Sequence, residues 1–101
     1  MHAQVDQQII KFLEEQHVCV ITTIMCDGMP HPAATHYSML DNPFTLFFCI
    51  DDRSITAQNV AGNGNMAVLV GCNEVIPITV QMRGEASIVK DEDTNAGWMY
   101  F

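Results

Sequence analysis

Three polar residues, Arg53, Ser54 and Thr56, form the most suggestive cluster in the sequence. They follow an apolar run over residues 44–50 and a short acidic loop, and they open a helix-like segment. Ser54 suits a helix start, because its hydroxyl accepts a hydrogen bond from an unpaired backbone N–H of the first turn. The free N–H groups and the positive end of the helix dipole attract anions, so the pattern is typical of a phosphate site. An ordinary capped helix with a surface arginine accounts for the same residues.

Other residue types that do chemistry lack a useful spacing. His31 and His36 lie five residues apart on one predicted strand, so they point to opposite faces, while His2 and His17 lie elsewhere. No serine has the G-x-S-x-G flanks of a hydrolase nucleophile, and none of the four cysteines has a basic neighbourhood. We therefore expect no metal site, and we identify no catalytic acid, base or nucleophile.

Composition argues against several classes of partner. The chain has 101 residues, 49% of them hydrophobic, and twelve acidic against four basic residues give a net charge of −8. Nucleic acids and anionic membranes both attract basic proteins. No apolar run reaches the ~18 residues of a membrane-spanning helix, and the N-terminus does not resemble a signal peptide. We expect a cytoplasmic protein that binds neither nucleic acid nor membranes. The cysteines form no C-x-x-C pair, which favours a reduced setting, although a disulfide between two strands remains an alternative.

The alternation of apolar and turn-forming residues predicts a small, mainly β protein. Residues 5–16 are expected to form an amphipathic helix with Val5, Ile9, Phe12 and Leu13 on one face. The other expected elements are strands at 17–25, 31–40, 44–50, 66–72 (buried on both faces) and 75–89 (bent at Gly84), a helix at 54–60 and the start of a further helix at 94–101.

The connections favour a closed sheet. Asp27-Gly28 between two strands predicts a hairpin with a two-residue turn in which Gly28 has a positive φ. Five or six mostly antiparallel strands in about 100 residues indicate a small barrel or curled sheet, which also protects the strand edges.

Four stretches together resemble the FMN-binding split β-barrel of the pyridoxamine 5'-phosphate oxidase-like family. They are the opening helix and strand over residues 9–23, the hairpin Asp27-Gly28-Met29-Pro30-His31, residues 46–59, and Val80–Ala86. The resemblance spans most of residues 9–89. It implies a mainly β fold with small helices, a split barrel of five to six mostly antiparallel strands, in a single domain over residues 1–101.

The resemblance also implies an FMN site shared between the two subunits of a homodimer. The residues carried over by position are Ala33, Thr35, His36 and Ser38 on the flavin-facing strand, Phe48 and Cys49 beside the ring, Arg53, Ser54 and Thr56 near the phosphate, and Thr79 from the second subunit.

The sequence departs from the family in two ways. Family members usually carry a basic residue at the position of Thr56, and often another near Ala33, so Arg53 and helix N–H groups are left to hold the phosphate. The sequence also ends at Phe101, before the C-terminal substrate-phosphate motif of the true oxidases. We therefore expect a domain without the C-terminal part of the family, and no genuine pyridoxamine 5'-phosphate oxidation.

These expectations combine into two hypotheses of different kinds. The first is an FMN-dependent oxidoreductase that acts on a small-molecule substrate, with the flavin supplying the redox chemistry. The alternative is a flavin-free dimer, structural or ligand-binding, whose cofactor site has degenerated.

Overall fold

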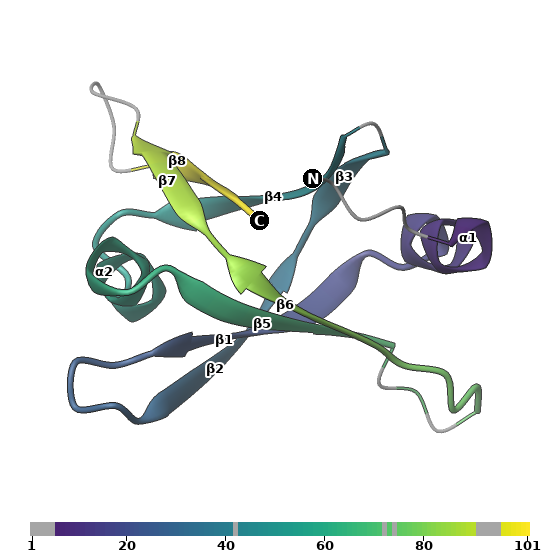
Figure 1. The fold of residues 1–101 in the computed structure, drawn as a ribbon, viewed down its shortest axis with the longest axis horizontal. Helices are drawn as coiled ribbons and strands as arrows, with labels where there is room; N and C mark the ends of the chain where they lie inside the picture. Colours follow the sequence, from purple (N-terminus) through teal and green to yellow (C-terminus); the bar gives the residue numbers. More distant parts are fainter. Residues whose placement is uncertain (1–5, 42, 72, 74, 91–95) are drawn as a thin grey trace.

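Two four-stranded antiparallel sheets face each other in the computed structural model, which describes residues 6–41, 43–71, 73, 75–90 and 96–101. The first sheet has the strand order β2-β1-β5-β6, and the second has the order β3-β4-β8-β7. The two sheets form separate layers, with α1 and α2 at opposite ends of the space between them (Figure 1). The elements are α1 (Gln7–Glu15), β1 (Val18–Ile24), β2 (Pro30–His36), β3 (Ser38–Asp41), β4 (Phe44–Asp51), α2 (Ile55–Gly62), β5 (Asn65–Val70), β6 (Val80–Glu85), β7 (Ser87–Lys90) and β8 (Ala96–Tyr100).

This arrangement confirms the predicted mainly β split barrel, with eight strands in place of five or six. The extra strands arise because two long predicted strands are each divided between the sheets, and because the C-terminal segment is extended. No helix in the described part of the chain is long and apolar enough to cross a membrane.

The predicted strand over residues 31–40 is divided at Tyr37, where the chain passes from the first sheet to the second. The backbone N–H of Tyr37 donates to the carbonyl oxygen of His17 (3.2 Å), and its hydroxyl donates to the carbonyl oxygen of Leu13 (2.5 Å). The half-buried ring also packs against the core. These contacts hold Tyr37 at the junction of α1 and β1, so β2 pairs with β1 while β3 pairs with β4.

The predicted strand over residues 75–89 begins only at Val80 and divides at Ala86, not at Gly84. The backbone N–H of Ala86 donates to the carbonyl oxygen of Gly64 over 2.7 Å. A Cβ atom on Gly64 would lie 2.7 Å from the carbonyl oxygen of Ala86, so only glycine permits this approach. The chain crosses here from β6 in the first sheet to β7 in the second (Figure 1).

The C-terminal segment forms β8, where a helix was predicted. β8 lies between β4 and β7, and Trp98 pairs with Cys49 of β4. Trp98 is half-exposed whereas Met99 is fully buried, which is the alternation of a strand. The first residues of the predicted helix, Thr94 and Asn95, lie outside the described residues, as does the acidic triplet 91–93.

The predicted N-terminal helix is confirmed, and its buried side differs only in part from the expected one. Asp6 caps α1 by accepting a hydrogen bond from the N–H of Gln8 (2.7 Å). The buried side chains are Ile10 and Leu13, and Phe12 is half-buried against the core, whereas Ile9 is 37% exposed. Val5 lies outside the described residues.

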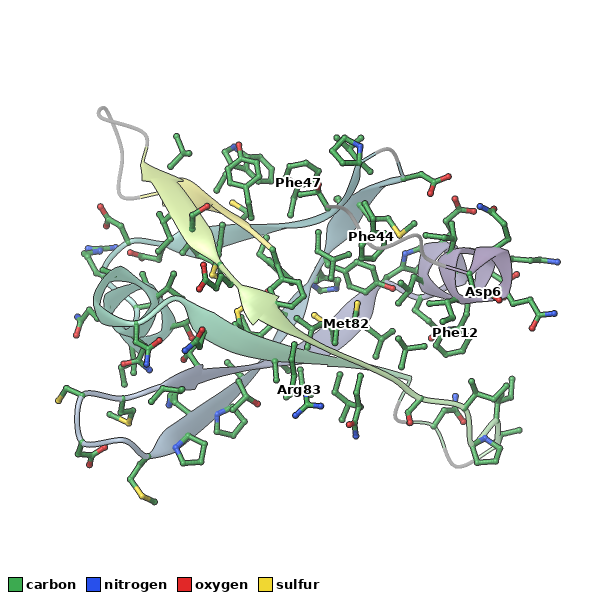
Figure 2. The ribbon with its side chains drawn as sticks, viewed as in Figure 1. Asp6, Phe12, Phe44, Phe47, Met82 and Arg83 are labelled. Carbon is green, nitrogen blue, oxygen red and sulfur yellow. The ribbon has the colours of Figure 1, made fainter. Side chains whose placement is uncertain are left out.

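The core fills the space between the sheets. β5 contributes three buried residues, Met66, Val68 and Val70, which alternate with half-buried ones. The prediction that this strand is buried on both faces was therefore wrong; its last expected residue, Cys72, lies outside the described residues. Figure 2 shows the same alternation in β6, where Met82 points between the sheets and Arg83 points away. The other large buried core side chains are Leu13, Ile21, Leu46, Phe48 and Met99.

One polar contact inside this core fixes the position of α2. The side-chain amide of Asn59 donates to the hydroxyl oxygen of Thr23 over 3.0 Å, and both residues are buried. A buried amide loses its hydration, so this hydrogen bond favours one placement of α2 against β1.

The β1–β2 hairpin has a three-residue loop, where a two-residue turn was predicted. The N–H of Gly28 donates to the carbonyl oxygen of Met25 (2.8 Å), and the N–H of Met25 donates to that of Met29 (2.9 Å). Gly28 has a φ of 89°, as predicted, but no non-glycine residue in the described chain has a positive φ. A two-residue type I′ turn needs a positive φ at Asp27 as well, so the loop is instead a turn closed by Gly28 in the left-handed conformation.

We expect Gly28→Ala to lower the free energy of unfolding by about 1–2 kcal/mol, because a Cβ disfavours the left-handed conformation. Chemical denaturation measures this change. Gly62→Ala is the matched control, since its Cβ would meet open space at the end of α2, and it should leave stability unchanged or slightly raised. Equal stability of Gly28→Ala and the wild type would contradict the described turn.

Candidate functional site

A hollow of about 300 Å³ lies against the outer face of the second sheet. Three parts of the chain form its walls: the β2–β3 junction, β4 and β8. The lining residues are 35–38 from the junction, Phe47 and Cys49 from β4, and Trp98 from β8. The hollow exists because the chain changes sheets at Tyr37, which brings the end of β2 beside the outer face of β4.

The register of β4 decides which of its side chains reach the hollow. Leu46 and Phe48 are fully buried, whereas Phe47 is half-buried and Cys49 is exposed. Figure 2 shows Phe47 on the side of β4 that faces away from the first sheet. Adjacent residues of a strand point to opposite faces, and it is Phe47 and Cys49, not Phe48, that line the hollow. Phe47 takes the place that we had expected for Phe48.

Aromatic side chains cover much of the outer face of the second sheet. Phe47 and Tyr100 pack edge to face with their ring centroids 5.0 Å apart, and Phe47 is paired with Tyr100 across the β4–β8 ladder. Trp98 is 51% exposed and lies opposite Cys49. Trp98 is not among the predicted site residues, because its segment was predicted to begin a helix. The alternating aromatic residues at 98 and 100 are the signal that predicts a strand with an aromatic face.

An ion pair continues this face beyond the hollow. Asp51 follows Cys49 by two positions on β4, so it lies on the same face. Arg53 donates from Nε to Asp51 Oδ1 (3.1 Å) and from Nη2 to Asp51 Oδ2 (2.9 Å), and its backbone N–H also donates to Oδ1 (2.9 Å). The side chains are 70% and 49% exposed, respectively. The hydrogen bonds from Arg53 lower the pKa of Asp51 to about 2, and Asp51 in turn raises the pKa of Arg53.

The start of α2 uses Ser54 as predicted but buries Thr56. The Ser54 hydroxyl oxygen accepts a hydrogen bond from the N–H of Ala57 (3.1 Å), and the Ser54 N–H donates to the carbonyl oxygen of Asp51 (3.0 Å). Thr56 is only 7% exposed, because α2 packs between the sheets and turns this side inward. The side chain of Thr56 is therefore not exposed at the helix start, unlike that of Arg53.

The predicted site residues fall into three groups in the structure. Four of them, Thr35, His36, Ser38 and Cys49, line the hollow. Arg53 and Ser54 lie just beyond the end of β4. The others do not line the hollow: Ala33 packs against the core, Phe48 and Thr56 are buried, and Thr79 is exposed ahead of β6.

Among the residues that the structure describes, no group of three or more histidine, cysteine, aspartate or glutamate side chains is placed to hold a metal ion. His31 is half-buried and His36 is exposed, in keeping with their alternate positions on β2. What the hollow offers instead is an aromatic surface, hydroxyl groups and, beyond it, a paired arginine. Such a set can bind a flat heteroaromatic ring.

Comparison of the sequence with known families decides the family. The model of the family described as pyridoxamine 5'-phosphate oxidase matches residues 5–100. The chain belongs to this family. None of the curated proteins matches it.

Solved structures of similar fold agree with the observed architecture. General Stress Protein 26 from Bacillus anthracis has a TM-score of 0.81 and 22% identity, over 100% of this chain and 88% of its own. A protein named F420 reductase has a TM-score of 0.81 and 16% identity, over 95% and 93%. HutZ, a heme storage protein from Vibrio cholerae, has a TM-score of 0.76 and 12% identity, over 98% and 94%. At these identities, the similarity establishes that this pyridoxamine 5'-phosphate oxidase family member has the split-barrel fold.

We expect Arg53→Ala to raise the pKa of Asp51 from about 2 toward the ordinary value of about 3.9. The lowered pKa means that the ion pair stabilises the fold above the ordinary pKa and that this contribution is lost as the pH falls toward 2. Carboxyl chemical shifts measured by NMR over pH 1.5–6 (an approximate range that brackets both values) report the change. Arg83→Ala, an exposed arginine on β6, should leave the pKa of Asp51 unaltered. An unchanged pKa in Arg53→Ala would show that the ion pair does not form.

Proposed function

We propose that this protein binds FMN as a homodimer, with the flavin ring in the hollow against the second sheet, and that it acts as an oxidoreductase on a small molecule. The observation that carries the proposal is the convergence of Thr35, His36, Ser38 and Cys49 in one hollow beside Trp98. Four residues expected from the family resemblance thus line the same hollow as Trp98, which the resemblance did not include.

The side chains around the hollow suit a flavin ring. Trp98 and Phe47 offer flat apolar surface for stacking, and the hydroxyls of Thr35 and Ser38 can exchange hydrogen bonds with polar ring atoms. Ligand sites combine such apolar walls with a few polar groups that fix orientation. A bound flavin would supply electron or hydride transfer, and these residues would position its ring and shield it from water.

The phosphate end depends on Arg53. This guanidinium lies on the same side as the outer face of β4, held by Asp51, and it is 70% exposed. Charge-assisted hydrogen bonds from arginine to phosphate are among the stronger polar contacts in proteins. The buried, uncharged Thr56 cannot supply the second cation that the family usually has.

Exposed apolar side chains support the proposed homodimer. Val75 is 86% exposed, Ile76 and Ile78 are more than half exposed, and Val18 on β1 is 52% exposed. The outer face of the first sheet also carries a hollow of about 550 Å³ over β1, β5 and β6. A second subunit would cover apolar surface that a domain of this size leaves in water, and Thr79 beside Ile78 would then lie near an interface.

The second hypothesis, a flavin-free dimer, is favoured by one specific observation. The guanidinium of Arg53 already has a carboxylate partner for two of its three nitrogens, Nε and Nη2. A site whose cation is satisfied within the chain does not need a phosphate. The absorption spectrum of the purified protein, and of the protein mixed with FMN and passed over a desalting column, distinguishes the two hypotheses.

We expect Arg53→Ala to weaken FMN binding about ten-fold or more and to change riboflavin binding less than about two-fold, because riboflavin lacks the phosphate. Titration of flavin fluorescence measures both affinities. Lys11→Ala removes the same charge from the exposed face of α1 and should affect neither flavin. An equal loss of affinity for FMN and riboflavin would place the phosphate elsewhere.

A homodimer should have a mass of about twice the 11.3 kDa of the chain, with at least roughly 1,000 Å² buried in the interface. Light scattering coupled to size-exclusion chromatography measures the mass at micromolar concentration. Ile78→Asp should shift the equilibrium toward monomers if the exposed segment before β6 is in the interface, whereas Lys11→Asp on α1 should not. A monomeric wild type would contradict the proposal.

A further inference from the structure

We propose that Asp51 competes with the ligand phosphate for Arg53, and that this competition sets the preference of the site between phosphorylated and unphosphorylated ligands. The inference rests on the proposed flavin site. It makes Asp51 a residue that determines specificity, a role that the family resemblance does not assign to it.

The geometry of the ion pair shows what a phosphate would have to displace. A guanidinium binds carboxylates and phosphates best through two parallel N–H groups. In Arg53, the Nε–H and one N–H of Nη2 form such a pair, and both point at Asp51, at 3.1 and 2.9 Å. A phosphate must therefore replace the carboxylate or bind through the remaining donors of the guanidinium.

The carboxylate stays beside Arg53 even when the guanidinium turns away. Asp51 Oδ1 also accepts a hydrogen bond from the backbone N–H of Arg53 over 2.9 Å, and the Asp51 carbonyl oxygen accepts from the N–H of Ser54 over 3.0 Å. Asp51 is also the last residue of β4 and pairs with Ala96 of β8. A displaced Asp51 would remain within a few ångströms of the phosphate and would repel it.

A second carboxylate strengthens this effect. Asp52 precedes Arg53, and within the described part of the chain its buried Oδ1 atom has no hydrogen-bond partner. Two aspartates thus place negative charge at the start of α2, where other helices attract an anionic ligand. The uncharged Thr56 and Ala33 add no compensating cation. The positive charge of Arg53 at the phosphate end of the site is thus largely neutralised by Asp51 and Asp52 of the same chain.

Asp51→Asn tests the competition with little change of shape. Asparagine keeps an oxygen that can accept from the Arg53 backbone N–H, but it removes the negative charge. We expect the ratio of FMN to riboflavin affinity to rise about five-fold or more in Asp51→Asn, with riboflavin affinity changed less than about two-fold. In the Arg53→Ala background, the same substitution should have a smaller effect, because the contested cation is gone.

Asp41→Asn is the matched control. It makes the same change of net charge at an exposed position at the end of β3, so it separates a local effect from the general effect of a less acidic protein. The competition model is overturned if the affinity ratio is unchanged in Asp51→Asn, or if Asp41→Asn raises it equally.

A titration with inorganic phosphate keeps this inference separable from the proposed function. The NMR signal of the Arg53 Nε–H group reports phosphate binding directly, whether or not a flavin binds. Phosphate should shift this signal at lower concentration in Asp51→Asn than in the wild type or in Asp41→Asn. If neither flavin binds, the proposed function fails, and an unaltered phosphate titration in Asp51→Asn would reject the competition as well.

Discussion

The candidate site depends on the change of sheet at Tyr37. One hydrogen bond from its backbone to His17 and one from its hydroxyl to Leu13 hold this residue at the junction of α1 and β1. Because the chain turns from β2 into β3 at this point, Thr35 and Ser38 reach the same hollow as Cys49 and Trp98. A strand that continued straight through residue 37 would leave the outer face of β4 without the wall formed by the β2–β3 junction. Burial raises the pKa of the Tyr37 hydroxyl to about 12, with a smaller contribution from Cys19, so it remains a hydrogen-bond donor at physiological pH.

The side chains of β4 alternate between the core face and the outer face of the second sheet. Leu46 and Phe48 fill the core, while Phe47, Cys49 and Asp51 form a continuous outer face. The ion pair with Arg53 lies at the end of that face, so the aromatic surface and the arginine belong to one strip of the molecule. Because of this continuity, a ligand that filled the hollow and extended along β4 would meet the charges of Asp51 and Arg53.

Much of the fold could be predicted from local patterns. The helix cap at Ser54 and the left-handed Gly28 follow from the intrinsic preferences of serine and glycine, and both are confirmed. The division at Tyr37 could not be predicted in this way. Half-buried residues alternate without interruption from His31 through Tyr37 to Met39, so no proline, glycine or phase change marks the break; long-range hydrogen bonds to Leu13 and His17 impose it.

The site could be predicted only in part, for similar reasons. Phe47 and Phe48 are identical in type, so the sequence cannot say which one faces the core; the register with β8 decides it. The burial of Thr56 depends on how α2 packs between the sheets, which no local pattern reports. The pairing of Asp51 with Arg53 is different, because opposite charges two residues apart at a strand end were visible in the sequence. Their bidentate geometry shows that Arg53 is already paired with a carboxylate, so a phosphate would have to compete with Asp51 for its N–H groups.

The central claim, that a flavin ring lies against the outer face of the second sheet, can be tested with the only tryptophan of the chain, Trp98. Its emission should fall steeply as FMN is added, because a flavin in contact with an indole quenches it, and the fall should saturate at one FMN per chain. Free tryptophan amide, titrated in parallel, corrects for light absorbed by the flavin. Saturable quenching at that ratio is the predicted result. FMN that binds, as shown by its own fluorescence, while the emission of Trp98 falls no more than that of the free tryptophan amide would contradict the account.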